Sequence, residues 1–170
     1  ERLLAQKQVL DLPERSSPTS ANDSIKTESL TGIVLDDAQA ELTGDWSRST
    51  NFKPYVADGY IFTGEKNSKG DGESTATFRF EVPESGEYEL WMAYSPHMTR
   101  ASNVPVIVCS GNHKEEFIVD QTQPLPAGQP FRSVGTIQLK HRSESIITIS
   151  DRQTIGFVIV DALQMLPKGP

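Results

Sequence analysis

The sequence GEYELWMAY at residues 86–94 alternates polar and apolar side chains with a period of two. Successive side chains of a β-strand point to opposite faces of the sheet, so this pattern is typical of a strand with one buried face. One face is expected to enter a core: Tyr88, Leu90, Met92 and Tyr94. Trp91 falls on the other face and is therefore the best candidate for a contact outside the core, with a ligand or with another domain.

Similar short runs occur on both sides of this strand. Together they predict nine strands, at residues 32–36, 60–63, 74–82, 87–94, 104–110, 115–119, 135–139, 145–150 and 157–166. The segments between them, such as NSKGDG and PESG, consist of residues that favour turns, and the chain contains 12 Gly and 11 Pro. The pattern predicts an all-β fold, an antiparallel β-sandwich of jelly-roll type over residues 30–167.

The first 29 residues have a different composition. Residues 1–12, ERLLAQKQVLDL, are good helix formers and are expected to form a short helical tail of a preceding domain. Residues 13–29 are rich in Ser, Pro and Thr and are expected to form a linker. Because the chain opens at Glu1 without Met, we expect it to be a piece of a longer protein.

Charge and composition exclude several classes of partner. The net charge of −7 is unfavourable for binding nucleic acid or anionic lipid, and no apolar run approaches the ~20 residues of a membrane helix. Cys109 is the only cysteine, lies in the apolar run 104–109, and is expected to be a small buried side chain. No disulfide can form within the chain.

No catalytic pattern is visible. The three histidines, at 97, 113 and 141, fall in predicted loops or at strand ends without metal-ligand spacing. Ser110 lacks the Gly-x-Ser-x-Gly motif of hydrolases, and GDG at 70–72 is not followed by the residues of a phosphate-binding loop. We expect the isolated chain to have neither enzyme activity nor a cofactor.

Three aspartates are placed unusually. Asp36 and Asp37 end a predicted strand, and Asp161 lies inside the apolar run 157–162. A buried carboxylate needs a partner, because an unpaired buried charge costs several kcal/mol. Asp161 is expected either to accept backbone N–H groups or to pair with an arginine. The alternative is a calcium ion that Asp161 shares with Asp36 or Asp37, with Asp37 and Asp161 as the chosen ligands.

Aromatic side chains are concentrated in one stretch of 17 residues, 46–62. The rings in this stretch belong to Trp46, Phe52, Tyr55, Tyr60 and Phe62. Exposed rings can stack on sugars, while neighbouring polar groups bind the hydroxyls. The alternative is that most of these rings close the ends of the barrel.

From Leu30 to Pro167 the chain resembles the golvesin/xanthan-lyase carbohydrate-binding-like module, a β-sandwich at the C-terminal end of larger secreted bacterial proteins. The matching residues are Asp36-Asp37 with Ala40, Gly44 and Trp46; Gly59-Tyr60; GEYEL at 86–90 leading to Tyr94; RASNVPV at 100–106; VDQ at 119–121; SVGT at 133–136; and GFVIVDALQ at 156–164.

The subtype is similar to the module that follows FAD-dependent oxidoreductase domains. The resemblance implies a secreted or periplasmic location and a parent catalytic domain as partner, with polysaccharide as a possible second partner. No Gly-x-Gly-x-x-Gly follows a strand, so no flavin site is expected in this chain.

Five residues become ligand-binding candidates: Trp46, Tyr60, Trp91, Arg100 and Asn103. Arg100 is expected to reach a carboxylate through two hydrogen bonds, with Asp120 or Asp161 as its acceptor.

The leading hypothesis is a non-catalytic, carbohydrate-binding accessory module of an exported bacterial enzyme. A structural or assembly domain that packs on the parent enzyme, with Trp91 and residues 1–12 in the interface, is the second hypothesis. A polysaccharide-active enzyme in its own right is the third, and the absence of a catalytic pattern disfavours it.

Overall fold

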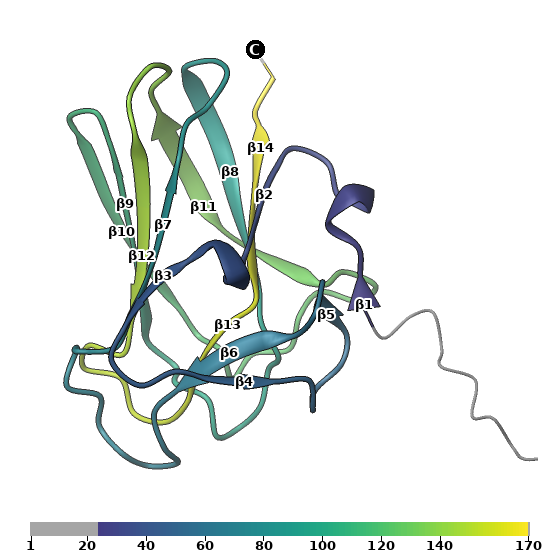
Figure 1. Ribbon diagram of the computed structural model, residues 1–170, viewed down its shortest axis with the longest axis vertical. Coiled ribbons are helices and arrows are strands. Elements are labelled where there is room, and N and C mark those ends of the chain that lie inside the picture. Colours follow the sequence, from purple (N-terminus) through teal and green to yellow (C-terminus); the bar gives the residue numbers. More distant parts are fainter. Residues whose placement is uncertain (1–23, 170) are drawn as a thin grey trace, which may run out of the picture.

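Two antiparallel sheets face each other across the main core in the computed structural model, which describes residues 24–169 (Figure 1). The five-stranded sheet has the order β10-β9-β12-β7-β3. Its strands are β3 (Glu41–Thr43), β7 (Thr75–Phe80), β9 (Val104–Ser110), β10 (His113–Val119) and β12 (Ser145–Ser150).

The four-stranded sheet has the order β11-β8-β14-β2. Its strands are β2 (Ile33–Asp36), β8 (Gly86–Ala93), β11 (Phe131–Leu139) and β14 (Ala162–Pro167). The predicted antiparallel β-sandwich is confirmed.

Alternation along the strands builds this core, as expected for two sheets that pack face to face. The four residues predicted to face inward from residues 86–94 are all buried: Tyr88, Leu90, Met92 and Tyr94. Phe78 of β7 and Ile147 of β12 face them from the other sheet and are also buried. Cys109, predicted to be buried, is instead half-buried, because the alternate positions Val106 and Val108 take the inward side of β9.

A three-stranded sheet, β13-β6-β4, runs across one end of the sandwich (Figure 1). Its strands are β4 (Ser47–Ser49), β6 (Tyr60–Thr63) and β13 (Val158–Val160). The single strand predicted at 157–166 is therefore wrong, since Asp161 divides it into β13 and β14. β13 pairs with β6, whereas β14 pairs with β2 and β8 in a different sheet. The chain changes sheets at Asp161, so one continuous strand is not possible there.

A second, smaller core covers the opposite face of the four-stranded sheet. β1 (Ser24–Ile25) and β5 (Tyr55–Val56) form a parallel pair beside it. The buried members of this core are Val56, Ala93, Phe131 and Ala162, and Trp91 packs against them.

Residues 24–29 fall in the predicted linker, yet they contain β1 and the short helix η1 (Thr27–Ser29). The predicted helical tail at 1–12 lies outside the described residues. A second short helix, η2 (Asp37–Gln39), follows β2. Within residues 24–169 no helix has the length and apolar character needed to cross a bilayer.

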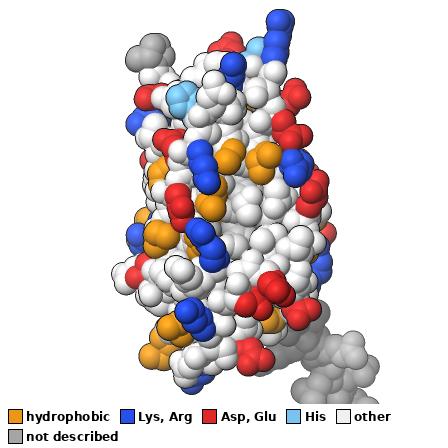
Figure 2. All heavy atoms as spheres, turned by 90° about the vertical axis from the view of Figure 1, so that its left-hand side faces the viewer, with side chains coloured by type: hydrophobic (Ala, Val, Ile, Leu, Met, Phe, Trp, Pro, Cys, Tyr) orange, Lys and Arg blue, Asp and Glu red, His pale blue; other side chains and the backbone are white. Residues whose placement is uncertain are grey.

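Acidic and basic side chains are mixed on the side of the molecule where β9 and β10 lie (Figure 2). Arg152 pairs with Glu116 of β10 at 3.0 Å, and Arg79 of β7 pairs with Glu144 at 2.8 Å. This side therefore carries no broad region of one charge sign.

Candidate functional site

A pocket of about 280 Å³ lies where the loop of residues 94–103 meets the three-stranded sheet. Four aromatic rings line it, those of Phe52, Tyr60, Phe62 and Phe157. Its volume is just below the ~300–1,000 Å³ typical of small-molecule sites. The pocket therefore suits a ligand as small as a sugar ring.

Local hydrogen bonds and ring contacts position these aromatic side chains. Phe52 follows β4, and its backbone N–H donates to the hydroxyl of Tyr60 at 3.3 Å. Phe62 and Phe157 meet edge to face, with ring centroids 5.9 Å apart. Phe52 is 41 % exposed, whereas Tyr60 is buried. Phe52 is thus the ring that the pocket presents to solvent.

Arg100 is the buried cation of this pocket and is only 8 % exposed. Its guanidinium carbon lies 4.8 Å from the ring centroid of Phe52 and 5.9 Å from that of Phe157, within the range of cation–π attraction. Nε donates to the carbonyl oxygen of Ser95 at 3.0 Å, and Nη2 donates to Ser95 Oγ at 3.3 Å. Burial lowers the pKa of Arg100.

The predicted ion pair between Arg100 and Asp120 or Asp161 is wrong. Within residues 24–169 no carboxylate forms an ion pair with Arg100. Asp120 Oδ1 instead accepts the backbone N–H of Thr122 at 2.9 Å, and Asp161 accepts a backbone N–H of β5. Both carboxylates thus accept from other donors, and neither contacts the arginine.

The loop that carries Arg100 is fixed to the chain ahead of β13. The N–H of Phe157 donates to the carbonyl of Thr99 at 3.0 Å, and the N–H of Ala101 donates to the carbonyl of Phe157 at 2.8 Å. Gly156 has φ of +103°, and a Cβ atom there would lie 2.6 Å from the carbonyl oxygen of Thr99. Only glycine permits this approach. The backbone therefore sets the position of Arg100 before any ligand binds.

The five predicted ligand-binding residues do not form one site. Tyr60 and Arg100 lie in the pocket. Trp46 packs against the main core, and its Nε1 donates to Thr43 at 2.9 Å. Asn103 Nδ2 donates to the carbonyl of Gln153 at 2.9 Å. Trp91 lies apart, on the outer face of the four-stranded sheet.

Sequence reasoning placed Phe52 and Phe62 in the aromatic stretch without choosing them as ligand-binding candidates. Phe157 was missed, because it begins an apolar run that predicts a core strand. His97 lies in a loop, as predicted, and is exposed; it also lines the pocket, with its ring centroid 5.8 Å from that of Phe52.

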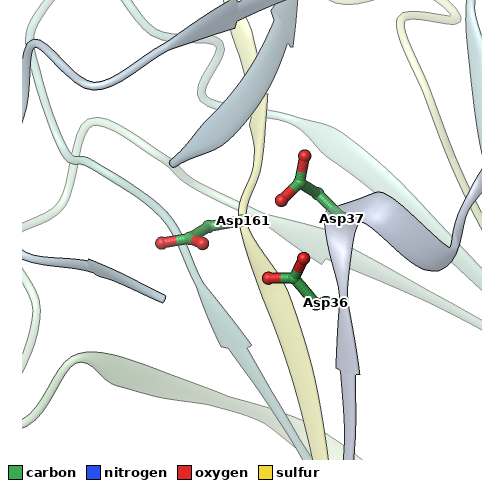
Figure 3. Close-up of side chains that lie close together, drawn as sticks. All are labelled: Asp36, Asp37 and Asp161. Atoms are coloured by element: carbon green, nitrogen blue, oxygen red, sulfur yellow. The ribbon is translucent and has the colours of Figure 1, made fainter. Parts of the chain in front are cut away.

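Asp36, Asp37 and Asp161 form a second cluster, which we call the aspartate trio (Figure 3). One carboxylate oxygen from each lies within 4.8 Å of the others. The trio forms because β2 ends at Asp36 beside the point where the chain changes sheets at Asp161. The carboxylate of Asp161 accepts the N–H of Val56, and Asp37 accepts from Arg48 Nη1 at 3.0 Å. The expectation that Asp161 binds a backbone N–H is confirmed.

Crowding and burial make this trio hard to ionise. Burial raises the pKa of Asp161 to about 8, against a smaller opposing effect of the Val56 N–H. Burial, together with the charge of Asp36, raises the pKa of Asp37 to about 7. Carboxylate oxygens are also the ligands that calcium prefers, but calcium takes 6–8 of them. A calcium ion bound by Asp37 and Asp161 stays a prediction.

The chain is similar over most of its length to part of a xanthan lyase. A xanthan lyase of Bacillus sp. (strain GL1) is 24 % identical over 146 residues, which is 82 % of this chain and 15 % of that protein. The solved structure of Paenibacillus xanthan lyase matches with a TM-score of 0.69 and 27 % identity, over 80 % of this chain and 13 % of that one. The chain thus spans about one-seventh of the length of these relatives.

Carbohydrate-binding modules share the fold. A family 35 carbohydrate-binding module from Clostridium thermocellum matches with a TM-score of 0.54 and 17 % identity, over 82 % of this chain and all of that one. The model of the Golvesin C-terminal domain family matches residues 33–167, about four-fifths of the chain. The chain therefore belongs to the Golvesin C-terminal domain family.

Proposed function

We propose that this chain is a non-catalytic, carbohydrate-binding accessory module of a larger exported bacterial enzyme, and that it binds saccharide in the Phe52–Arg100 pocket. The observation that carries the proposal is the pocket itself. It combines an exposed aromatic ring, a buried arginine and loop hydroxyl groups at one end of a β-sandwich.

The lining of the pocket matches the chemistry of a sugar. Phe52 offers an apolar surface to the C–H groups of a pyranose ring. Arg100, together with the hydroxyl of Thr99, provides polar groups for sugar hydroxyls. A mostly apolar pocket with a few fixed polar groups is typical of small-molecule sites.

Affinity electrophoresis of the full chain in native gels tests the proposal. The gels contain a panel of neutral and acidic polysaccharides, and we expect at least one to retard the chain relative to a gel without polysaccharide. No retardation by any polysaccharide in the panel would argue against carbohydrate binding.

The relatives named above support a lyase as parent more than the predicted flavin-dependent oxidoreductase. Both relatives are xanthan lyases, and this chain matches a small part of each. We infer attachment to a polysaccharide-active parent and export with it. Attachment to a flavin enzyme stays a prediction without support from these relatives.

A structural or assembly role is the second candidate, and Trp91 favours it. Nε1 of Trp91 is buried and has no hydrogen-bond partner within residues 24–169. The ring lies beside Leu30, Pro130 and Leu166 in a shallow depression on the outer face of the four-stranded sheet. Trp91 is half-buried, so part of its ring is left for a partner at this face to cover. Sedimentation of the chain, and of the parent protein with and without it, separates the two roles.

A further inference from the structure

Arg100 carries a buried positive charge that the protein itself does not neutralise. The side chain is 92 % buried and has no ion pair among residues 24–169. Burying an unpaired charge is costly, so buried arginines are usually paired with carboxylates. Here the partners are the neutral Ser95, Thr99 and two aromatic rings.

The hydrogen bonds of Arg100 leave donors free. A guanidinium has five N–H groups. Nε and Nη2 each donate once to Ser95, and Nη1 donates once to Thr99 Oγ1 at the long distance of 3.5 Å. One N–H on each terminal nitrogen therefore has no acceptor among the described residues. Two such groups form the donor pair that a carboxylate binds.

The charge of the pocket differs from that of the chain. The chain has a net charge of −7, yet the residues that line the Phe52–Arg100 pocket include no Asp or Glu. A neighbouring pocket, in contrast, is lined by four acidic side chains: Asp45, Glu65, Asp71 and Asp151. The pocket at Arg100 is thus a locally positive site on an acidic protein.

We propose that the Phe52–Arg100 pocket recognises the carboxylate of an acidic sugar residue in a polysaccharide, with Arg100 as its binding partner. The inference rests on the proposed function, because it assumes that this pocket binds saccharide. The carboxylate accepts the two free N–H groups of Arg100, and the sugar ring lies against the exposed side of Phe52. Ligand binding then provides the counter-charge that the fold does not.

The test compares matched pairs of polysaccharides. Polygalacturonate, glucuronoxylan and xanthan are each used beside the same polymer after chemical reduction of its carboxylates to hydroxymethyl groups. Affinity electrophoresis of the unaltered chain is run in 0.5 M NaCl, where the Debye length is short and attraction by distant surface charges is screened. At least one carboxylated polymer is expected to bind about tenfold more tightly than its reduced form, the factor of one charge-assisted hydrogen bond.

Substitutions test whether the preference for the carboxylated polymer depends on Arg100. Arg100→Gln is expected to lose the preference for the carboxylated polymer, and Arg100→Lys to keep part of it. Arg79→Gln is the matched control, because it removes the same charge from an exposed site on β7 that does not line the pocket. Thermal melting of each variant reports whether it folds, and the wild-type comparison still tests the proposal if Arg100→Gln does not.

The possible outcomes separate the two proposals. Equal retardation by a polymer and its reduced form overturns the anionic proposal and leaves carbohydrate binding standing. No retardation by either member of any pair overturns the anionic proposal, and it overturns carbohydrate binding as well if the panel of neutral and acidic polysaccharides also fails to retard the chain. A carboxylate preference that survives in folded Arg100→Gln overturns the assignment to Arg100.

Discussion

The backbone N–H of Val56 lies 3.1 Å from both carboxylate oxygens of Asp161, although 105 positions separate the two residues. This contact ties β5 to the point where the chain passes from one sheet to another. Asp161 is 4 % exposed and lies beside Asp36 and Asp37. The Asp161 carboxylate therefore stabilises the fold through this hydrogen bond, whereas its ionisation beside two other carboxylates is unfavourable.

The first prediction concerns pH. Burial raises the pKa of Asp161 from the ordinary 3.8 of an aspartate to about 8, so the folded chain binds more protons than the unfolded chain between these two pH values. Stability from this group is complete below about pH 4 and is lost as pH rises towards 8. The loss is at most about 1.4 kcal/mol per pH unit for one group. Chemical denaturation in the presence of a chelator, from pH 4 to 9, measures it.

Asp161→Asn is the variant for this prediction, because the amide oxygen still accepts the Val56 N–H and carries no charge. It is expected to reduce the pH dependence and to leave the part that comes from Asp37, whose pKa burial raises to about 7, while Asp45→Asn at an exposed site leaves the whole dependence unchanged. If stability of the wild type instead rises between pH 5 and 8, Asp161 is not the dominant titrating group.

The calcium hypothesis makes a separate prediction. An ion bound by Asp37 and Asp161 favours their charged forms, so millimolar CaCl2 is expected to raise the melting temperature at pH 8 and a chelator to reverse it. The shift is expected to disappear in Asp161→Asn. Equal melting temperatures with calcium and with chelator would contradict the calcium hypothesis.

Phe52→Ala is expected to weaken polysaccharide binding about tenfold, because the exposed ring is the apolar surface of the pocket. Leu42→Ala is a matched control, since Leu42 is also 41 % exposed but lies on β3, outside the pocket. Leu42→Ala is expected to keep its stability within about 0.5 kcal/mol, as is usual for surface positions. Phe52→Ala is expected to lose about 1 kcal/mol, because the ring also contacts Arg100 and His97. Unchanged binding by Phe52→Ala would place the saccharide elsewhere.

Gln121 is predicted to be essential for stability. It is fully buried, its Nε2 donates to the carbonyl of Ile159 at 2.7 Å, and its Oε1 accepts the N–H of Ile159 at 2.8 Å. The side-chain amide of Gln121 thus bonds both backbone groups of Ile159 in β13, as a residue of a neighbouring strand would. Gln121→Leu leaves two buried backbone groups unpaired and is expected to cost about 2–6 kcal/mol. Gln123→Leu, at an exposed position, serves as control in urea denaturation, and equal effects of the two would refute this role.

The sandwich was predictable from sequence where strands are long and half-buried. β8 alternates clearly, so the sequence alone predicts its inward residues. Short strands gave no such signal, because β4 is Ser-Arg-Ser and none of its residues is buried. Its position depends on pairing with β6, which sequence periodicity does not encode.

The candidate site was predictable only in part. Asp161 was identified because a carboxylate in an apolar run must have a partner. The partner of Arg100 was not predictable, since Ser95 binds it through a backbone carbonyl and leaves no mark in the residue pattern. The juxtaposition of Phe52, Arg100 and Phe157 depends on two loops and a strand end that meet only in the folded chain.

The most direct test of the account is to locate the bound saccharide on the chain. Backbone amide chemical shifts of the 15N-labelled chain are recorded during titration with an oligosaccharide from whichever polysaccharide retards it. Saccharide binding in the pocket predicts that the largest shift changes occur at Phe52, Thr99, Arg100 and Phe157. Changes confined to the face around Leu30 and Trp91, with the pocket residues unmoved, would contradict it.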